Sequence, residues 1–573
     1  MAVTGGTVDM KTAVGFPFPQ GCTVEGQTAN FSVAVPEGQT CELIIYKKGA
    51  RTSAFSQEMP YSDVAGNLHF LSVVLEQPED YEYCYKIGGK IVPDPYGKAF
   101  SGREHWSVSK GKEKRKLRTR IVTDTFDWGK SQFPHLKKED VIAYSLHVRG
   151  FTKHSSSGVA HKGTFDGVTE KLPYLQKLGI NQIHLMPVYE FDENQRHVNY
   201  WGYGKAYFFA PKASYAAGDP VNEMKSLVRQ MHLAGIEVIL EMPFTEGTTF
   251  SLILDCLRYW VMQYHVDGFI VNPYICNPDE LAKDPVLAKS KILKKEDGFQ
   301  NVMRRFLKGD EGMIRDVICQ LKNHDTQLYN YIASHNGFTL CDVVSYDGKH
   351  NEANGENNLD GPDYNYSWNC GAEGNSRKKA VNELRKNQIF NAFFLLLFAQ
   401  GMPCILSGDE FMNTQKGNNN AYCQDNLISW LDWNQLSRQE ELYTFVCRLI
   451  ALRKACMKQT AKKSEDTMGR SGIPQISYHG EDAWQMPAGR ASRQLGVFYH
   501  EECTEKDFYI AYNMHWLSHS FALPSLPKGM EWVCIAGTKE GVLDEKEAVP
   551  VKDKKVQLEE RTIKVFVGRQ AKE

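Results

Sequence analysis

The sequence predicts an α/β fold in three parts. Residues 1–129 contain short alternating apolar runs between Gly, Pro and Asp turns, a pattern typical of a β-sandwich. Residues 130–445 alternate between buried strands and amphipathic helices, which indicates a parallel barrel. Residues 446–573 open with a long helix and then return to short strands. A chain of 573 residues is long enough for several domains with cores of their own.

Both outer parts contain recognisable strands. In the first part we expect strands at residues 30–35 (NFSVAV) and 41–46 (CELIIY). In the last part we expect them at residues 508–513 (FYIAYN) and 562–567 (TIKVFV).

The middle part contains strands that read as continuously buried. Residues 181–187 (NQIHLMP) and 236–241 (IEVILE) are apolar-rich, and each follows an amphipathic helix. Those helices end at Gly179 and Gly235, where glycine supplies the left-handed helix cap. Repeated units of this kind predict a parallel barrel. The longest apolar stretch, residues 390–399, is too short to span a bilayer and is expected to be a buried helix.

Bulk properties exclude several function classes. The net charge of -2 provides no attraction to nucleic acid or to an anionic membrane. The 14 cysteines form no CxxC pair and no zinc-type cluster, so we expect reduced thiols, no metal and no cofactor. The first residues show no basic segment followed by an apolar run. We therefore expect a soluble cytoplasmic protein.

Four motifs carry a family resemblance. They are VIAYSLHVRGFT at residues 141–152, NYWGY at 199–203, SGDEF at 407–411 and GNNNAYCQDNLISWLDW at 417–433. Together they resemble the isoamylase and glycogen-debranching branch of the α-amylase family, glycoside hydrolase family 13. The resemblance implies a (β/α)8 TIM barrel followed by an antiparallel β-sandwich. It also implies that the N-terminal β-sandwich, with GFPFP at residues 15–19, is similar to a glycogen- or starch-binding module. The alternative is a packing domain without sugar contacts.

The resemblance also implies a nucleophile position, which here holds an amide. Retaining glycosidases use two carboxyl groups about 5 Å apart, one as nucleophile and one as general acid. Residues 267–272 read DGFIVN where the family has DGFRFD, so Asn272 occupies the nucleophile position and Ile270 that of the supporting arginine. An amide cannot form a productive glycosyl ester. Losing both charges together keeps the site electrically balanced.

The general-acid position is also changed. Residues 284–295 read DPVLAKSKILKK, which places Lys295 where the family has glutamate. A shift of one residue would bring Glu296 to that position, as a displaced acid. The alternative is that the KKED run is an exposed turn with no catalytic role.

The third carboxylate position is Asn336, in the segment SHNGFTL at residues 334–340. Of the innermost sugar subsite the resemblance leaves Tyr203 as a stacking residue, with Trp201 beside it, and His335 as a hydrogen-bonding residue. The alternatives are a core role for the two aromatic residues and a satisfied barrel histidine for His335.

A sugar-binding histidine of the family is replaced by Glu246. The loop that follows it is shorter than in the family, which predicts a wider or flatter mouth. The polar run from Asn418 to Asn426 is expected to form a hydrogen-bonded loop rather than a calcium site.

These substitutions favour a catalytically inactive member of the family. We expect it to bind an α-glucan, glycogen or maltodextrin, or to regulate glycogen metabolism through a protein partner. One alternative is an active α-1,6-glucan debranching hydrolase with relocated carboxylates, for which the candidates are Glu241, Glu246, Asp267 and Glu296. Another is a protein-interaction subunit that binds no sugar.

Overall fold

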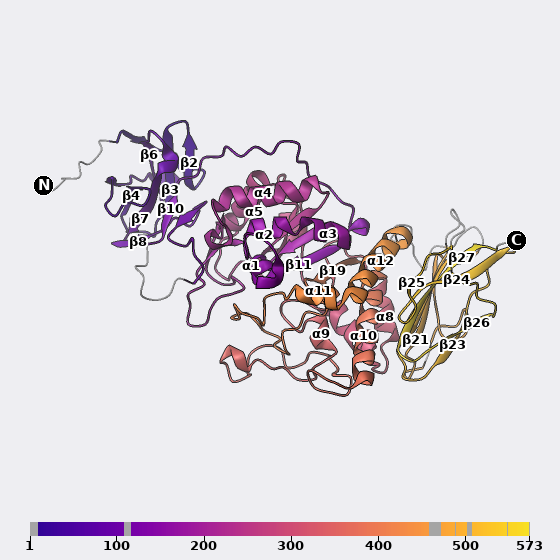
Figure 1. Cartoon of the computed structure of the whole chain (residues 1–573). Helices are drawn as coiled ribbons and strands as arrows, with labels where there is room; N and C mark the ends of the chain where they lie inside the picture. The colour runs from indigo at the N-terminus through magenta and orange to yellow at the C-terminus, as the bar shows by residue number, and fades with distance from the viewer. Residues whose placement is uncertain are drawn as a thin grey trace.

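The computed structural model describes residues 10–107, 116–457, 472–487, 489–500, 507–546 and 548–571. Figure 1 shows the N-terminal strands at one end of the molecule, the barrel in the middle and the C-terminal strands at the other end. Among the described residues, no helix combines the length and the apolar character that crossing a bilayer requires.

The N-terminal part is a β-sandwich, as predicted. One sheet has the order β1-β6-β3-β2, and the other has the order β5-β4-β7-β10-β9 with β8 beside β7. Side chains from both sheets, among them Phe31, Leu43 and Tyr83, form the core between them. The strands are β1 (Thr12–Val14), β2 (Gly21–Glu25), β3 (Thr28–Ala34), β4 (Cys41–Lys47), β5 (Phe55–Glu58), β6 (Leu68–Val74), β7 (Tyr81–Ile87), β8 (Lys90–Val92), β9 (Phe100–Ser101) and β10 (Arg118–Arg120).

The middle part is a parallel barrel, which confirms the predicted fold class. Its sheet has the order β17-β16-β15-β12-β11-β19-β18, seven strands within the described residues. A parallel bridge between Lys294 and Leu328 links the two edge strands and nearly closes the ring. The strands are β11 (Ala143–Leu146), β12 (Gln182–Leu185), β15 (Glu237–Met242), β16 (Gly268–Val271), β17 (Lys291–Leu293), β18 (Tyr329–Asn330) and β19 (Met402–Leu406).

Helices surround this ring because each buries one apolar face against the strands. Two consecutive helices, α7 and α8, lie between β17 and β18, which is where an eight-stranded barrel would have one more strand. The main barrel helices are α1 (Val148–Lys153), α2 (Phe165–Glu170), α3 (Leu172–Leu178), α4 (Pro220–Leu233), α5 (Phe250–Tyr264), α7 (Gly298–Lys308), α8 (Ile314–Leu321), α10 (Lys379–Leu397) and α12 (Glu440–Cys456).

The C-terminal part is antiparallel, as expected. A sheet of order β20-β21-β22-β27-β24-β25 packs with the pair β23-β26 around Phe498, Tyr509, Phe521 and Trp532. Helix α12 runs through the expected boundary between residues 445 and 446, so the domain limits stay a prediction. The strands are β20 (Ile476–His479), β21 (Gln494–Tyr499), β22 (Phe508–Asn513), β23 (His519–Ala522), β24 (Met530–Gly537), β25 (Gly541–Val542), β26 (Lys555–Leu558) and β27 (Thr562–Gln570).

A buried lysine holds the segment that leads to the barrel mouth. The Lys212 Nζ donates to Glu190 Oε1 and Glu193 Oε2, each at 2.8 Å, and all three side chains are almost fully buried. The Glu193 carbonyl in turn accepts a hydrogen bond from the Asn199 N–H at 3.0 Å. The position of Tyr203, four residues further along, therefore depends on this ion cluster.

Replacing Lys212 with Met should lower the free energy of unfolding by about 3–5 kcal/mol, because it leaves buried Glu190 without its cation and Glu193 with only Arg103, 3.8 Å away. Urea unfolding followed by tryptophan fluorescence measures the change. The control is Lys386→Met, because Lys386 pairs with Glu441 at the surface with 44% and 72% of the side chains exposed. That control should stay within about 0.5 kcal/mol of wild type. Equal losses in the two variants would contradict this account of the cluster.

Candidate functional site

Three side chains meet at the C-terminal end of the barrel strands. The Tyr203 hydroxyl lies 2.5 Å from Glu241 Oε1 and 2.6 Å from His335 Nε2. The Glu241 carboxylate and the His335 ring are also directly close, at 3.8 Å between Oε1 and Nε2. Glu241 belongs to β15, while Tyr203 and His335 come from loops that follow other barrel strands. A tyrosine thus links a carboxylate to an imidazole.

Lys295 lies at the same end of the barrel and faces its interior. Side chains alternate along a strand, so Lys295 lies on the same face as Leu293, which packs in the barrel core. Its Nζ lies 5.5 Å from the centre of the Tyr331 ring, another interior residue. Its charge also interacts with that of Glu241.

Burial shifts the protonation of this group of residues. It raises the pKa of Glu241, while the Tyr203 hydrogen bond and the Lys295 charge act in the opposite direction. It lowers the pKa of Lys295, against the attraction of Glu241. It lowers the pKa of His335 well below the ordinary value, and the Lys295 charge lowers it further. His335 is therefore a neutral imidazole near pH 7.

Asn272 forms part of a turn. Its Oδ1 accepts a hydrogen bond from the Tyr274 N–H at 3.0 Å, and its carbonyl accepts from the N–H groups of Ile275 and Cys276. The neighbouring inward position, Ile270, packs in the apolar interior beside Leu293. The amide at the expected nucleophile position therefore serves to build the loop.

The structure separates the remaining catalytic candidates. Asn336 is exposed in the turn next to buried His335. Glu296 faces away from the interior: its side chain is 51% exposed and pairs with Lys294 at 3.0 Å. The sequence left open whether Lys295 or Glu296 occupies the general-acid position. In the structure Lys295 faces the barrel interior and Glu296 lies on the surface.

Besides Glu296, two more of the four candidate relocated carboxylates lie away from the mouth cluster. Asp267 precedes β16, at the opposite end of the barrel, where it accepts from the Val238 N–H at 2.7 Å and contacts His232 at 2.9 Å. Placing it near the functional strand ends was wrong, because it stands at the start of its strand. Glu246 is exposed and lines a cleft of about 600 Å³ together with Arg103. This cleft lies along the shortened loop.

Trp201 is mostly enclosed. Only 7% of its surface is exposed, and it packs in an aromatic cluster with Tyr200 and Met186. Its ring centre still lies 5.1 Å from that of His335, edge to face. A core role at the barrel rim accounts for these contacts, and a direct sugar contact stays a prediction.

The polar loop near residue 420 is a network of amide hydrogen bonds. Asn419 Nδ2 donates to Asn365 Oδ1 at 2.8 Å, and its Oδ1 accepts from Asn351 at 2.8 Å. Asn420 Nδ2 donates to Asp360 at 2.9 Å. These bonds hold the loop around residues 418–420 against residues 351–365, which follow His335 in the chain.

The expected catalytic positions therefore present an amide, a lysine amine and a second amide. The carboxylate that does point inward is Glu241, which sequence reasoning named only as one of four relocated candidates. The alternation of side chains along the strand indicates that Glu241 faces inward, since it lies two residues after Ile239 of the barrel interior. The family motifs instead indicate the strands that carry the nucleophile and the general acid.

Comparisons with known proteins agree with this framework. Residues 138–246 match the family model described as the α-amylase catalytic domain. The chloroplastic isoamylase 1 of Arabidopsis thaliana is 30% identical over 90% of this chain and 84% of its own length. A glycogen operon protein GlgX homologue of Mycobacterium tuberculosis is 27% identical over 92% of this chain and 94% of its own.

Solved structures share the fold. The pullulanase type I of Bacillus subtilis, complexed with maltose, matches with a TM-score of 0.73 over 97% of this chain and 86% of its own. A pullulanase of Paenibacillus barengoltzii, in complex with maltohexaose and α-cyclodextrin, matches with a TM-score of 0.72 over 97% and 96%. At 19% and 18% identity these likenesses establish the architecture alone.

The first barrel motif contributes a titratable residue behind the mouth. His147 caps α1: its Nδ1 accepts from the Gly150 N–H at 3.0 Å, which leaves Nε2 to donate to the Tyr200 carbonyl at 2.8 Å. Burial lowers the pKa of His147 from 6.5 to about 4. The unfolded chain therefore binds this proton at a higher pH than the folded chain. The contribution of neutral His147 to folding stability is complete above pH 6.5 and is lost as the pH falls toward 4.

Between pH 7 and pH 5 the wild type should lose about 2 kcal/mol more stability than His147→Asn, because only the wild type exposes the protonatable His147 ring on unfolding. Asn retains the helix-capping oxygen, so the variant should fold. Urea unfolding at the two pH values measures the difference. Parallel losses in the two proteins would show that His147 does not cause the pH dependence.

Proposed function

This chain belongs to the isoamylase branch of the α-amylase family, and we propose that it binds α-glucan without hydrolysing it. The observation that carries the proposal is the chemistry of the three expected catalytic positions. Asn272 caps a turn, Lys295 faces the interior with an amine where a carboxyl group is needed, and Asn336 lies in an exposed turn. Losing a catalytic nucleophile costs on the order of 10^4 to 10^6 in rate.

Binding capacity remains at the same place. Tyr203 and His335 offer hydrogen-bonding groups, and Glu241 and Lys295 add a carboxyl group and an amine at the same end of the barrel. Such groups suit the hydroxyls of a sugar, which needs several donors and acceptors in one place. Solved pullulanases of similar fold are named as complexes with maltose and maltotetraose, which supports an α-glucan as the ligand here.

A family member that does not hydrolyse α-glucan would act by binding it. We therefore propose that the protein binds glycogen or maltodextrin and tethers or regulates a working enzyme of glycogen metabolism.

A second candidate function rests on Glu241. Its carboxyl faces inward and has a raised pKa, which is the property of a general acid in a glycosidase. An active debranching hydrolase would use Glu241 in this role, with its partner carboxylate supplied from elsewhere at the mouth.

Wild-type protein should release no reducing ends from glycogen, and Asn272→Asp alone should release none, because Ile270 offers the new carboxylate no cationic partner. A reducing-sugar assay together with iodine staining measures turnover. Activity in the wild type that disappears in Glu241→Gln but survives in Glu296→Gln would establish the second function instead. Glu296→Gln is the matched control because that side chain faces solvent.

Tyr203→Phe should weaken glycogen binding about tenfold, since it removes the hydroxyl that joins Glu241 and His335 and leaves both without this partner. Retardation in native gels cast with increasing glycogen measures the affinity. Tyr61→Ala removes a ring that is 64% exposed on the N-terminal sandwich and should leave retardation unchanged. Weaker retardation of Tyr61→Ala together with unchanged retardation of Tyr203→Phe would place the binding site on that sandwich instead. No retardation of the wild type would contradict glucan binding and favour an interaction subunit.

A further inference from the structure

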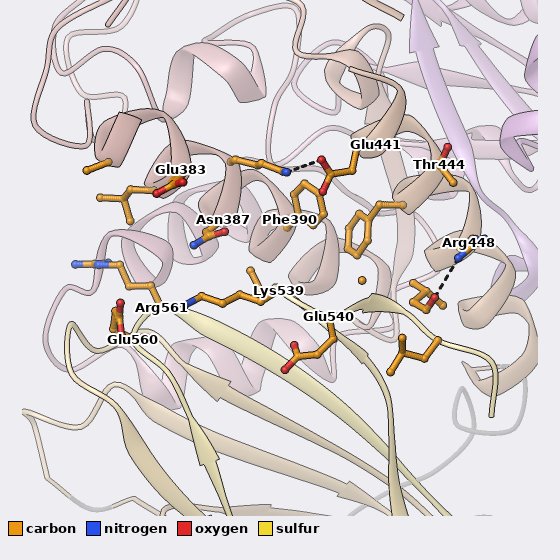
Figure 2. Close-up of a pocket in the computed structure, with 18 of the residues that line it drawn as sticks. Glu383, Asn387, Phe390, Glu441, Thr444, Arg448, Lys539, Glu540, Glu560 and Arg561 are labelled. Carbon is orange, nitrogen blue, oxygen red and sulfur yellow. Dashed lines mark hydrogen bonds and ion pairs between the residues drawn. The ribbon is translucent and has the colours of Figure 1, made fainter. Parts of the chain in front are cut away.

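A groove of about 1420 Å³ separates the barrel helices from the C-terminal sheet. Figure 2 shows Asn387 and Phe390 of α10 on one side, with Lys539 and Glu540 of the turn between β24 and β25 on the other. Pockets for drug-sized ligands hold about 300–1,000 Å³, so this groove has room for a longer molecule. Its lining comes from segments other than those that form the barrel mouth.

The charges of the groove favour a neutral ligand over an anionic one. Five carboxylates and four cations line it, so they nearly balance. The cations are also engaged: Lys386 pairs with Glu441 at 2.6 Å and Lys539 pairs with Glu559. The Arg448 Nη1 donates to a backbone carbonyl at 3.3 Å. A phosphate-bearing ligand would have to displace these partners, whereas a neutral ligand would not.

Several polar groups of the groove are available to a ligand. Within the described residues, the side chains of Asn387, Thr444, Glu440 and Glu560 make no hydrogen bond or ion pair with the protein. They come from both helices and from the turn before β27, so they surround the groove. Amide, hydroxyl and carboxylate groups together provide donors and acceptors for a ligand with many hydroxyls.

The groove also offers apolar contact. Phe390 and Phe445 stack with ring centres 4.2 Å apart and line its inner side. Trp516 lines the groove with 54% of its surface exposed, and it is held by His515, stacked at 4.2 Å, and by Arg493, at 4.7 Å from the ring centre. A fixed aromatic side chain loses little conformational freedom when a ligand binds. Apolar C–H faces combined with hydroxyls are characteristic of a pyranose chain.

We propose that this groove is a second α-glucan site, which binds a linear maltooligosaccharide chain apart from the barrel mouth. The proposal rests on the proposed function, because the choice of an α-glucan among hydroxyl-rich ligands follows from glucan binding by this family member. Two separate sites would let one protein hold two segments of a branched glucan, which raises the effective concentration at the second site.

The test is isothermal titration of the full-length protein with maltoheptaose, alongside glycogen gel retardation. Trp516→Ala and Thr444→Arg should each weaken groove binding at least about tenfold and lower the number of bound maltoheptaose molecules. Thr444 is an exposed position of α12, where Arg suits a helix, so the second variant preserves folding. Leu517→Ala is the matched control, because Leu517 is 58% exposed beside Trp516 but does not line the groove.

The outcomes separate the two proposals. Loss of one bound ligand in the groove variants, with Leu517→Ala unchanged, supports the second site. Unchanged binding in both groove variants, with weaker binding in Tyr203→Phe, overturns the second site and leaves the proposed function standing. A wild type that binds neither maltoheptaose nor glycogen overturns both.

Discussion

The nearly closed ring of parallel strands decides which side chains can meet at the barrel mouth. Each strand sends only every second residue inward, so the mouth residues are those that continue the interior positions. On β15 this residue is Glu241, after Ile239, and just beyond the end of β17 it is Lys295, after Leu293. A shift of one residue would exchange Lys295 for Glu296. The bridge between Lys294 and Leu328 holds that register.

The mouth remains electrically compensated although its carboxylates have changed. Glu241 and Lys295 attract each other electrostatically while burial shifts the pKa of each toward its neutral form, and His335 is neutral. A buried charge without a partner costs several kcal/mol, whereas a compensated set does not. Ile270 leaves no unpaired charge, because it packs in the apolar interior at the position where the family resemblance places an arginine. The site can therefore depart from hydrolytic chemistry without destabilising the barrel.

The framework around the mouth supports a binding role. Arg149 forms a two-point ion pair with Asp425 at 2.8 and 3.0 Å, which joins the first barrel motif to the last. The asparagine network around Asn419 joins two further loops. These contacts keep the loops in place independently of the expected catalytic positions, and the proposed glucan surface uses this framework. The groove beside the C-terminal sheet extends that surface in our proposal.

The sequence by itself determined the three-part fold, because strand and helix periodicities and glycine caps are local signals, and the residues at the expected catalytic positions follow from motif register. Only the tertiary structure decided the contacts. It linked Glu241 to Tyr203 and His335, turned Lys295 inward and Glu296 outward, and placed Asp267 at the far end of the barrel. It also built the groove from α10, α12 and the C-terminal sheet, which are far apart along the chain. Such contacts depend on ring closure and on the packing of distant segments, and no local pattern encodes either.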